Sequence, residues 1–186
     1  LRRSHPRMME WNTMEDKASG IKLLFLDVDG VLTDGRITLN EKGEEVKSFD
    51  VKDGFGLKLL MRHGIEVVIV TGRRSRVVAH RARELGIREV YQGISDKRLV
   101  CRRLIEKRGL MKSQVGSVGD DLPDLAMFRE SGLCLTVADA AREVREEADF
   151  ITSKRGGHGA VREICEWILR CRGCWPRIAF TEQSRG

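Results

Sequence analysis

The sequence of 186 residues is poor in aromatic side chains, which make up 5% of it, and it has no apolar run near the length of a membrane span. Because a membrane-spanning helix needs about 20 consecutive apolar residues, we expect no membrane partner. Nucleic-acid grooves combine stacking aromatic residues with a clustered basic stripe. Here the formal charge of +6 comes from scattered residues. The composition therefore favours a small anionic ligand over a nucleic acid.

Cysteine is the second scarce residue, with five copies in segments of helical and strand character. An odd number of this kind is typical of a reducing compartment, so we expect a cytoplasmic protein. Cys171 and Cys174 form a Cys-x-x-Cys pair. No second pair lies near enough to complete a four-ligand zinc site, which argues against a structural metal there.

The two ends of the chain differ from its middle. Residues 1–20 begin with basic residues but lack the apolar run of a secretory signal, so we expect a disordered leader. Residues 21–170 are expected to form one globular domain, because the chain is 41% apolar and long enough to bury a core. For residues 171–186 no role follows from the sequence, and their apolar side chains either pack on a partner or fray.

Short apolar segments alternate with helical patterns through the middle of the chain. This alternation predicts an α/β fold, a doubly wound, Rossmann-like parallel sheet with helices on both faces. Two β-prone runs at 36–39 and 44–50 predict a small hairpin flap, and no block is long enough for a separate cap domain. Strands are expected at 21–26, 65–70, 89–91, 114–118, 133–136 and 150–151, and helices at 57–63, 75–85, 97–108, 123–130, 139–147 and 160–170.

The first strand ends in two acids, Asp27 and Asp29. Ligands of open α/β sheets bind beyond the carboxyl ends of the strands, which places both residues where a substrate would lie. Side chains two residues apart in an extended segment point the same way, so the two carboxylates would repel each other unless they shared a proton or a cation such as Mg²⁺. The alternative is that one caps a turn and the other is solvated.

Three later segments carry further polar groups. Thr71 and Arg73 follow the second long strand, where a hydroxyl and backbone amides suit a phosphate, although an ordinary turn also fits. Lys97 opens a helix, a position unfavourable for a cation unless it meets an anion. A solvated surface lysine is the alternative. Three acids, Asp120, Asp121 and Asp124, follow another buried strand and indicate a divalent metal site.

These motifs, in this order, resemble those of the haloacid dehalogenase superfamily of phosphotransferases over residues 21–170. A narrower resemblance links four segments to the capless 3-deoxy-D-manno-octulosonate 8-phosphate phosphatase family. They are Leu-Thr-Asp-Gly ending at Gly35, Phe-Asp-Val-Lys-Asp-Gly ending at Gly54, Tyr-Gln-Gly-Ile-Ser-Asp-Lys ending at Lys97, and Gly-Gly-His-Gly-Ala-Val-Arg-Glu at 156–163.

The resemblance implies a Mg²⁺-dependent phosphatase. It implies that Asp27 is the nucleophile and Asp29 the general acid and base, with Thr71 and Lys97 holding the phosphoryl group. By the same resemblance, Mg²⁺ would bind the carboxylates of Asp27 and Asp120 and the backbone carbonyl of Asp29. Asp121 and Asp124 would orient these groups. The residues expected to contact substrate are Asp29, Asp50, Val51, Lys52, Asp53, Gly54, Lys58, Arg73, Arg81 and Lys97, with surface solvation as the alternative for Lys58 and Arg81.

Two other functions remain open at this point. One is a phosphatase for a nine-carbon acid sugar 9-phosphate, which would use the same catalytic residues. The other is a non-catalytic assembly module like the domains fused to cytidylyltransferases, which the intact acids argue against. The resemblance also implies a homotetramer, in which hairpin 36–50 and the glycine-rich loop 156–159 contact neighbouring subunits. We expect that loop to be a mobile lid, and a flexible linker is the alternative.

Overall fold

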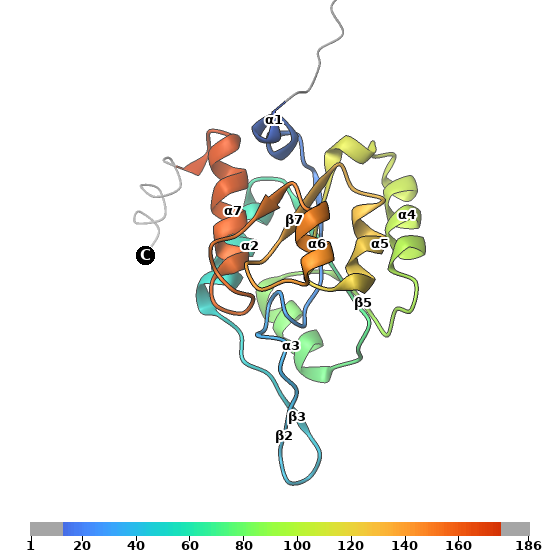
Figure 1. The fold of residues 1–186 in the computed structure, drawn as a ribbon, viewed down its shortest axis with the longest axis vertical. Coiled ribbons are helices and arrows are strands. Elements are labelled where there is room, and N and C mark those ends of the chain that lie inside the picture. The colour runs from blue at the N-terminus through green and yellow to red at the C-terminus, as the bar shows by residue number, and fades with distance from the viewer. Residues whose placement is uncertain (1–12, 176–186) are drawn as a thin grey trace, which may run out of the picture.

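The computed structural model describes residues 13–175, which form a parallel sheet with helices on both faces and a projecting hairpin (Figure 1). Six strands lie in the order β5-β4-β1-β6-β7-β8, so β1 is central and the chain crosses over on each side of it. This confirms the predicted doubly wound α/β fold. The strands are β1 (Leu23–Leu26), β4 (Glu66–Thr71), β5 (Glu89–Gln92), β6 (Val115–Val118), β7 (Leu133–Thr136) and β8 (Phe150–Ile151).

The helices divide between the two faces of the sheet. Alternate side chains of β1 point to opposite faces, so Leu24 and Leu26 pack with α2, α3 and α7, whereas Leu23 and Phe25 pack with α4 and α5. All four are fully buried, as expected for a central parallel strand. The helices are α1 (Met14–Ser19), α2 (Val51–Arg62), α3 (Arg76–Leu85), α4 (Lys97–Arg108), α5 (Leu125–Phe128), α6 (Arg142–Glu147) and α7 (Ala160–Cys171), with short 3₁₀ turns at Lys112–Gln114 and Leu122–Asp124.

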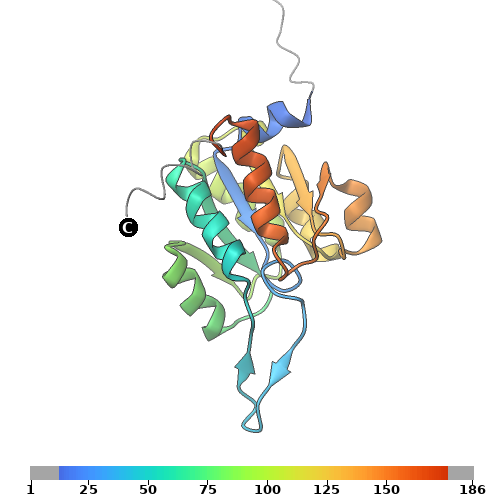
Figure 2. The same ribbon diagram turned by 90° about the vertical axis from the view of Figure 1, so that its left-hand side faces the viewer.

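The predicted hairpin is present but shorter than expected. Its strands β2 (Thr38–Leu39) and β3 (Glu45–Val46) pair antiparallel and extend away from the sheet (Figure 2). The segment Asn40–Glu44 closes on itself through the side-chain carbonyl of Asn40, which accepts from the amides of Lys42 and Glu44. Within residues 13–175 this hairpin is the whole insertion between β1 and α2, so the described part of the chain has no cap domain.

Helix α2 begins at Val51, six residues before the predicted start. Asp50 caps it by accepting a hydrogen bond from the Lys52 amide. Gly54 and Gly56 disfavour a helix by intrinsic propensity, which is why the sequence pattern missed this segment. The structure supplies the compensation, because a Cβ at Gly56 would lie only 3.1 Å from the Cβ of Cys165 on α7. A side chain at that position would therefore crowd the close contact of α2 with α7.

Three further expectations are corrected. Residues 14–19, predicted to belong to a disordered leader, form helix α1, which is capped by Thr13 and contacts α7. The helices predicted at 123–130 and 139–147 are shortened to α5 and α6. Here the backbone is used otherwise, since the Ala141 amide donates to the carbonyl of Asp120. Residues 1–12 and 176–186 lie outside the described part of the chain. Between residues 13 and 175 no helix has the length and apolar character needed to cross a membrane.

Candidate active site

Three carboxylates from two neighbouring strand ends meet at the carboxyl edge of the sheet. Asp27 follows β1, while Asp120 and Asp124 follow β6, which pairs with β1 in parallel. Ligand oxygens of the three residues all lie within 4.8 Å of one another. The acids that follow the first strand and those that follow β6 therefore lie together in the fold.

Lys97 lies between two of these acids. Its ammonium Nζ donates at 2.6 Å to Oδ1 of Asp27 and at 2.6 Å to Oδ1 of Asp124, and all three side chains are at most 8% exposed. The lysine that opens α4 has thus found the anions that the helix-dipole argument required, and the solvated-surface alternative is wrong. Asp124 also accepts from the amides of Asp120 and Asp121 through its other oxygen. It thereby fixes the turn that presents Asp120.

Burial and crowding change the acidity of this cluster. Burial, followed by the neighbouring Asp124 carboxylate, raises the pKa of Asp27 from 3.8 to about 7 against the opposing effect of Lys97. The same causes, burial first and then Asp124 and Asp27, raise the pKa of Asp120 to about 8. For Lys97, burial alone would lower the pKa, but the Asp27 and Asp124 carboxylates outweigh it and raise the pKa. One ammonium is therefore insufficient to balance the charge of three clustered carboxylates.

The cluster fits a small divalent cation. Asp120 Oδ1 is buried and has no hydrogen-bond partner, which is costly unless a cation or proton meets it. Gly30 makes room for this carboxylate, because a Cβ there would overlap the Asp120 side chain. Its φ of +89° is a second reason for glycine. Hard oxygen ligands, an excess of negative over positive charge and an unpaired buried oxygen together suit Mg²⁺.

Asp29 is not one of the three clustered carboxylates. Its Oδ1 contacts the ammonium of Lys47, and its Oδ2 lies 3.7 Å from Nε of Arg73. The two carboxylates of the Asp-x-Asp pair contact different ammonium groups, that of Lys97 for Asp27 and that of Lys47 for Asp29. The chain leaves the strand conformation after Leu26, so period-two alternation no longer applies. Metal binding by the Asp29 backbone carbonyl stays a prediction.

Thr71 and Asp121 occupy opposite sides of this edge. Thr71 is the buried last residue of β4, two positions beyond the pairing of Ile69 with Leu26 in β1. Asp121 is exposed and caps the 3₁₀ turn at 122–124 by accepting from the Leu122 amide. Its role in orienting the other groups of the site stays a prediction.

Residues expected to contact the sugar are spread over the first turn of α2. Val51 and Lys52 are exposed, and Asp50 caps the helix. The Asp53 carboxylate is turned inward, where its Oδ1 accepts from the Arg162 amide at the start of α7. The structure thus uses Asp53 to cap another helix, and its carboxylate, in a residue only 1% exposed, does not line an open sugar pocket.

The remaining predicted substrate contacts lie on α2 and α3. Arg81 covers Gly54, where a Cβ would meet its guanidinium, and it pairs with Glu84 at 2.9 Å and lies over the ring of Phe49. Lys58 is half-buried on α2. Of the cationic side chains predicted to bind a substrate carboxylate, only Arg73 is an ion-pair partner of Asp29.

The glycine-rich loop 156–159 packs against the loop that follows β1 in the same chain, residues 27–35, which carries Asp27 and Asp29 (the catalytic loop). The Gly157 amide donates to the carbonyl of Val31 at 2.9 Å, and the Gly156 amide donates to Asp139. A Cβ at Gly156 would overlap the carbonyl of Gly30. Glycine is therefore required for close packing here, and movement of the loop as a lid stays a prediction. Contact with a neighbouring subunit, through the exposed His158, stays a prediction.

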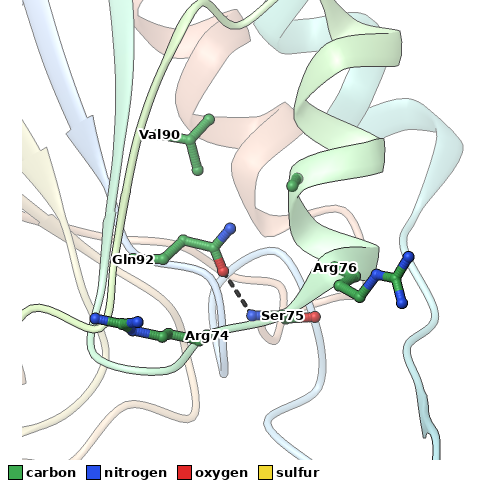
Figure 3. Close-up of a pocket in the computed structure, with 6 residues that line it drawn as sticks. Arg74, Ser75, Arg76, Val90 and Gln92 are labelled. Atoms are coloured by element: carbon green, nitrogen blue, oxygen red, sulfur yellow. Dashed lines mark hydrogen bonds between the residues drawn. The ribbon is translucent and has the colours of Figure 1, made fainter.

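A cavity of about 470 Å³ lies beside the β4–α3 turn and is shown in Figure 3. The Gln92 side chain accepts a hydrogen bond from the Ser75 amide across it, and the residues lining it are Arg74, Ser75, Arg76, Ala79, Val90 and Gln92. None of the clustered carboxylates lines this cavity.

Two residues of the site were not predicted as site residues from the sequence. Glu45 and Lys47 lie on the hairpin, eighteen and twenty residues after Asp27, yet Lys47 pairs with Asp29. Charged residues are common on short exposed hairpins, so the sequence carried no signal that would separate these two from the others. They are recognised only in the folded structure, where the base of the hairpin contacts the catalytic loop.

Comparisons with known proteins agree on one family. Residues 83–164 match a family described as haloacid dehalogenase-like hydrolase. The chain is 45% identical over 157 residues to the 3-deoxy-D-manno-octulosonate 8-phosphate phosphatase KdsC of Escherichia coli K12, which covers 84% of each protein. It resembles a crystal structure of the Moraxella catarrhalis phosphatase with magnesium, phosphate and KDO, at a TM-score of 0.88 and 44% identity over 90% of this chain and 97% of that one. The cobalt-bound Haemophilus influenzae enzyme gives a TM-score of 0.84 and 37% identity, covering 89% and 97%.

Proposed function

The chain belongs to the haloacid dehalogenase superfamily of hydrolases, and we propose that it is a Mg²⁺-dependent phosphatase that hydrolyses 3-deoxy-D-manno-octulosonate 8-phosphate. The observation that carries the proposal is the buried cluster of Asp27, Lys97, Asp124 and Asp120 at the carboxyl edge of β1 and β6. Such a cluster supplies a nucleophile, a cation for the phosphoryl group and ligands for a metal in one place. The non-catalytic alternative would have no use for this arrangement.

In the proposed reaction, Asp27 attacks phosphorus in line and forms an aspartyl-phosphate. Asp29 protonates the departing sugar oxygen and then takes a proton from the water that hydrolyses the intermediate. Lys97 donates to Asp27 in the resting site and would turn part of its hydrogen bonding to the phosphoryl oxygens. Thr71, at the end of the adjacent strand, is proposed to donate its hydroxyl to the same group.

Asp27 and Asp120 would hold Mg²⁺ through their carboxylates, with the Asp29 carbonyl as a third protein ligand. The bound ion supplies charge neutralisation between an anionic substrate and an anionic nucleophile. Asp124 keeps both its oxygens on Lys97 and on the amides of the turn, which supports an orienting role for it rather than direct ligation.

For the sugar side of the site we propose Arg73 and Arg81 as partners of the substrate carboxylate. Arginine binds a carboxylate through two parallel hydrogen bonds, and both residues lie near the hairpin base, one against Glu45 and one against Phe49. We propose the eight-carbon sugar phosphate as the substrate, and not the nine-carbon one, because the relatives are named for the eight-carbon compound. The first turn of α2 would contribute the exposed Val51 and Lys52.

The test is phosphate release from a panel of acid-sugar phosphates that includes the eight-carbon 8-phosphate and the nine-carbon 9-phosphate, each with Mg²⁺ and after metal removal. We expect the highest kcat/KM for the eight-carbon substrate and no turnover without metal. A higher kcat/KM for the nine-carbon substrate would overturn the assignment of substrate. No phosphate release from any member of the panel would overturn the enzymatic function itself.

We also propose a homotetramer that is held together through the hairpin. Its apolar side chains Ile37, Leu39 and Val46 are 59%, 58% and 50% exposed, a concentration that a two-stranded hairpin cannot bury by itself. Leu39→Glu is expected to lower the native mass measured by light scattering. The matched control is Met111→Glu, which also replaces an exposed apolar side chain, 64% exposed, but lies outside the hairpin and should leave the native mass unchanged. We place the enzyme in the cytoplasm, since all five cysteines are free thiols in the structure.

A further inference from the structure

Four charged side chains form a closed ring at the base of the hairpin. Lys47 contacts Oδ1 of Asp29 and lies 3.1 Å from Oε1 of Glu45. Arg73 Nη2 lies 3.0 Å from the same Glu45 oxygen, and its Nε lies 3.7 Å from Oδ2 of Asp29. Positive and negative groups alternate around the ring, which joins the catalytic loop, the hairpin and the β4–α3 turn.

The two cations of the ring differ in burial. The Lys47 side chain is 1% exposed, whereas that of Arg73 is 45% exposed. A buried ammonium is costly unless it is paired, so Lys47 is held by both carboxylates. Arg73 is held less tightly, because nearly half of its side chain is exposed to water and its contact with Asp29 is long.

The two oxygens of Asp29 are consequently in different environments. Oδ1 is engaged by the buried ammonium, while Oδ2 has only the long contact with Arg73. If Arg73 turns toward an anionic substrate, Lys47 still fixes Oδ1. The carboxylate then keeps its orientation and presents Oδ2 to the substrate.

We infer that Lys47, on the hairpin of the same chain, is a positioning residue that orients Asp29 for proton transfer. This rests on the proposed role of Asp29. In the first step the Asp27–phosphorus bond forms, the bond from phosphorus to the sugar oxygen breaks, and the proton on Asp29 Oδ2 goes to that oxygen. In the second step water attacks phosphorus, its proton returns to Asp29 Oδ2, and the Asp27–phosphorus bond breaks. Lys47 stays an ammonium throughout.

The experiment compares Lys47→Met, Lys47→Arg and the control Lys107→Met, which removes an exposed lysine from the last turn of α4. Steady-state kcat and KM are measured for the sugar phosphate and for p-nitrophenyl phosphate, together with native mass and melting temperature. General acid–base catalysis contributes about 10²- to 10⁴-fold, and a misoriented carboxylate loses part of this. We expect Lys47→Met to lower kcat about 10- to 100-fold with KM changed less than about threefold.

Lys47→Arg keeps the charge and is expected to recover kcat to within about fivefold of wild type, while Lys107→Met matches wild type. The inference is overturned if Lys47→Met keeps kcat within about twofold of wild type. It is also overturned if Lys47→Met lowers kcat together with the native mass or the melting temperature, and Lys47→Arg restores the mass and melting temperature but not kcat. Failure of the proposed function is seen separately, as a wild type inactive on every acid-sugar phosphate. The p-nitrophenyl phosphate rates then still decide the role of Lys47, because hydrolysis of the intermediate needs Asp29 with either substrate.

Discussion

Magnesium binding to the metal-free protein should release protons near neutral pH. Asp27 and Asp120 have pKa values raised to about 7 and about 8, because they are buried close to each other and to Asp124. Both carboxyl groups are therefore partly protonated near neutral pH when no metal is bound. A cation binds the ionised carboxylates, so we expect about one proton, or slightly more, to leave for each Mg²⁺ bound.

The sign of the pH dependence follows from this release. Raised pKa values mean that protons compete with the metal, so the apparent affinity rises as the pH increases from 6 to 8 and levels off above the higher pKa. One proton per ion corresponds to about a tenfold change in Kd for each pH unit. Magnesium at about 100 times its Kd should also stabilise the folded state by about 2.7 kcal/mol.

Calorimetric titration in two buffers with different ionisation enthalpies measures the proton release directly. Asp120→Asn is the informative variant, because it removes one proposed ligand and one carboxyl group whose pKa is raised. It should release fewer protons and bind Mg²⁺ more weakly. A Kd that is constant between pH 6 and pH 9, with no buffer-dependent enthalpy, would refute the reasoning about this cluster.

Three other changes test separate parts of the structure. Asp27→Asn keeps the side-chain shape but cannot attack phosphorus, so turnover should be abolished while the melting temperature is maintained. Substantial turnover by a clean preparation would contradict the nucleophile assignment. Gly30→Ala would overlap the Asp120 carboxylate and strain a φ of +89°, so calorimetry should detect weaker Mg²⁺ binding. Burial raises the pKa of Asp53 from 3.8 to about 6, a difference that corresponds to about 3 kcal/mol. The folded state disfavours the ionised form, so wild-type stability should fall by up to about 3 kcal/mol relative to Asp53→Asn as the pH rises from about 4 to above 6, measured by urea unfolding. Equal pH profiles would show that Asp53 titrates normally.

The pattern of apolar segments and helix stop signals explains why the fold was predictable. Segments such as Leu23–Leu26 are apolar at every position, which only a central parallel strand needs, and the helices between them carry their own stop signals. Gly86 and Gly109, for example, end α3 and α4 in the left-handed conformation. Because these signals are local, the order of strands and helices could be read from the chain, and with it the carboxyl edge where Asp27 and Asp120 lie.

Local signals failed where a distant segment changes what a residue can do. Gly54 and Gly56 read as helix breakers, yet they lie inside α2 because Arg81 and α7 approach them closely. Residues 156–159 read as a flexible loop, yet their glycines are needed for contact with the loop after β1. In both cases the missing side chain serves packing, and packing depends on a partner far away in the sequence.

The sequence by itself determined the order of strands and helices along the chain, the acids that follow β1 and β6, and the lysine that opens α4, because each lies at a boundary marked by its own neighbours. The tertiary structure alone decided how the charges pair. Lys97 pairs with Asp27 across seventy residues of chain, Asp29 pairs with Lys47 on the hairpin, and Asp53 turns inward to cap α7. Charge pairing acts over a few ångströms in space and leaves no periodic trace along the chain, so it becomes visible only when the elements are packed together.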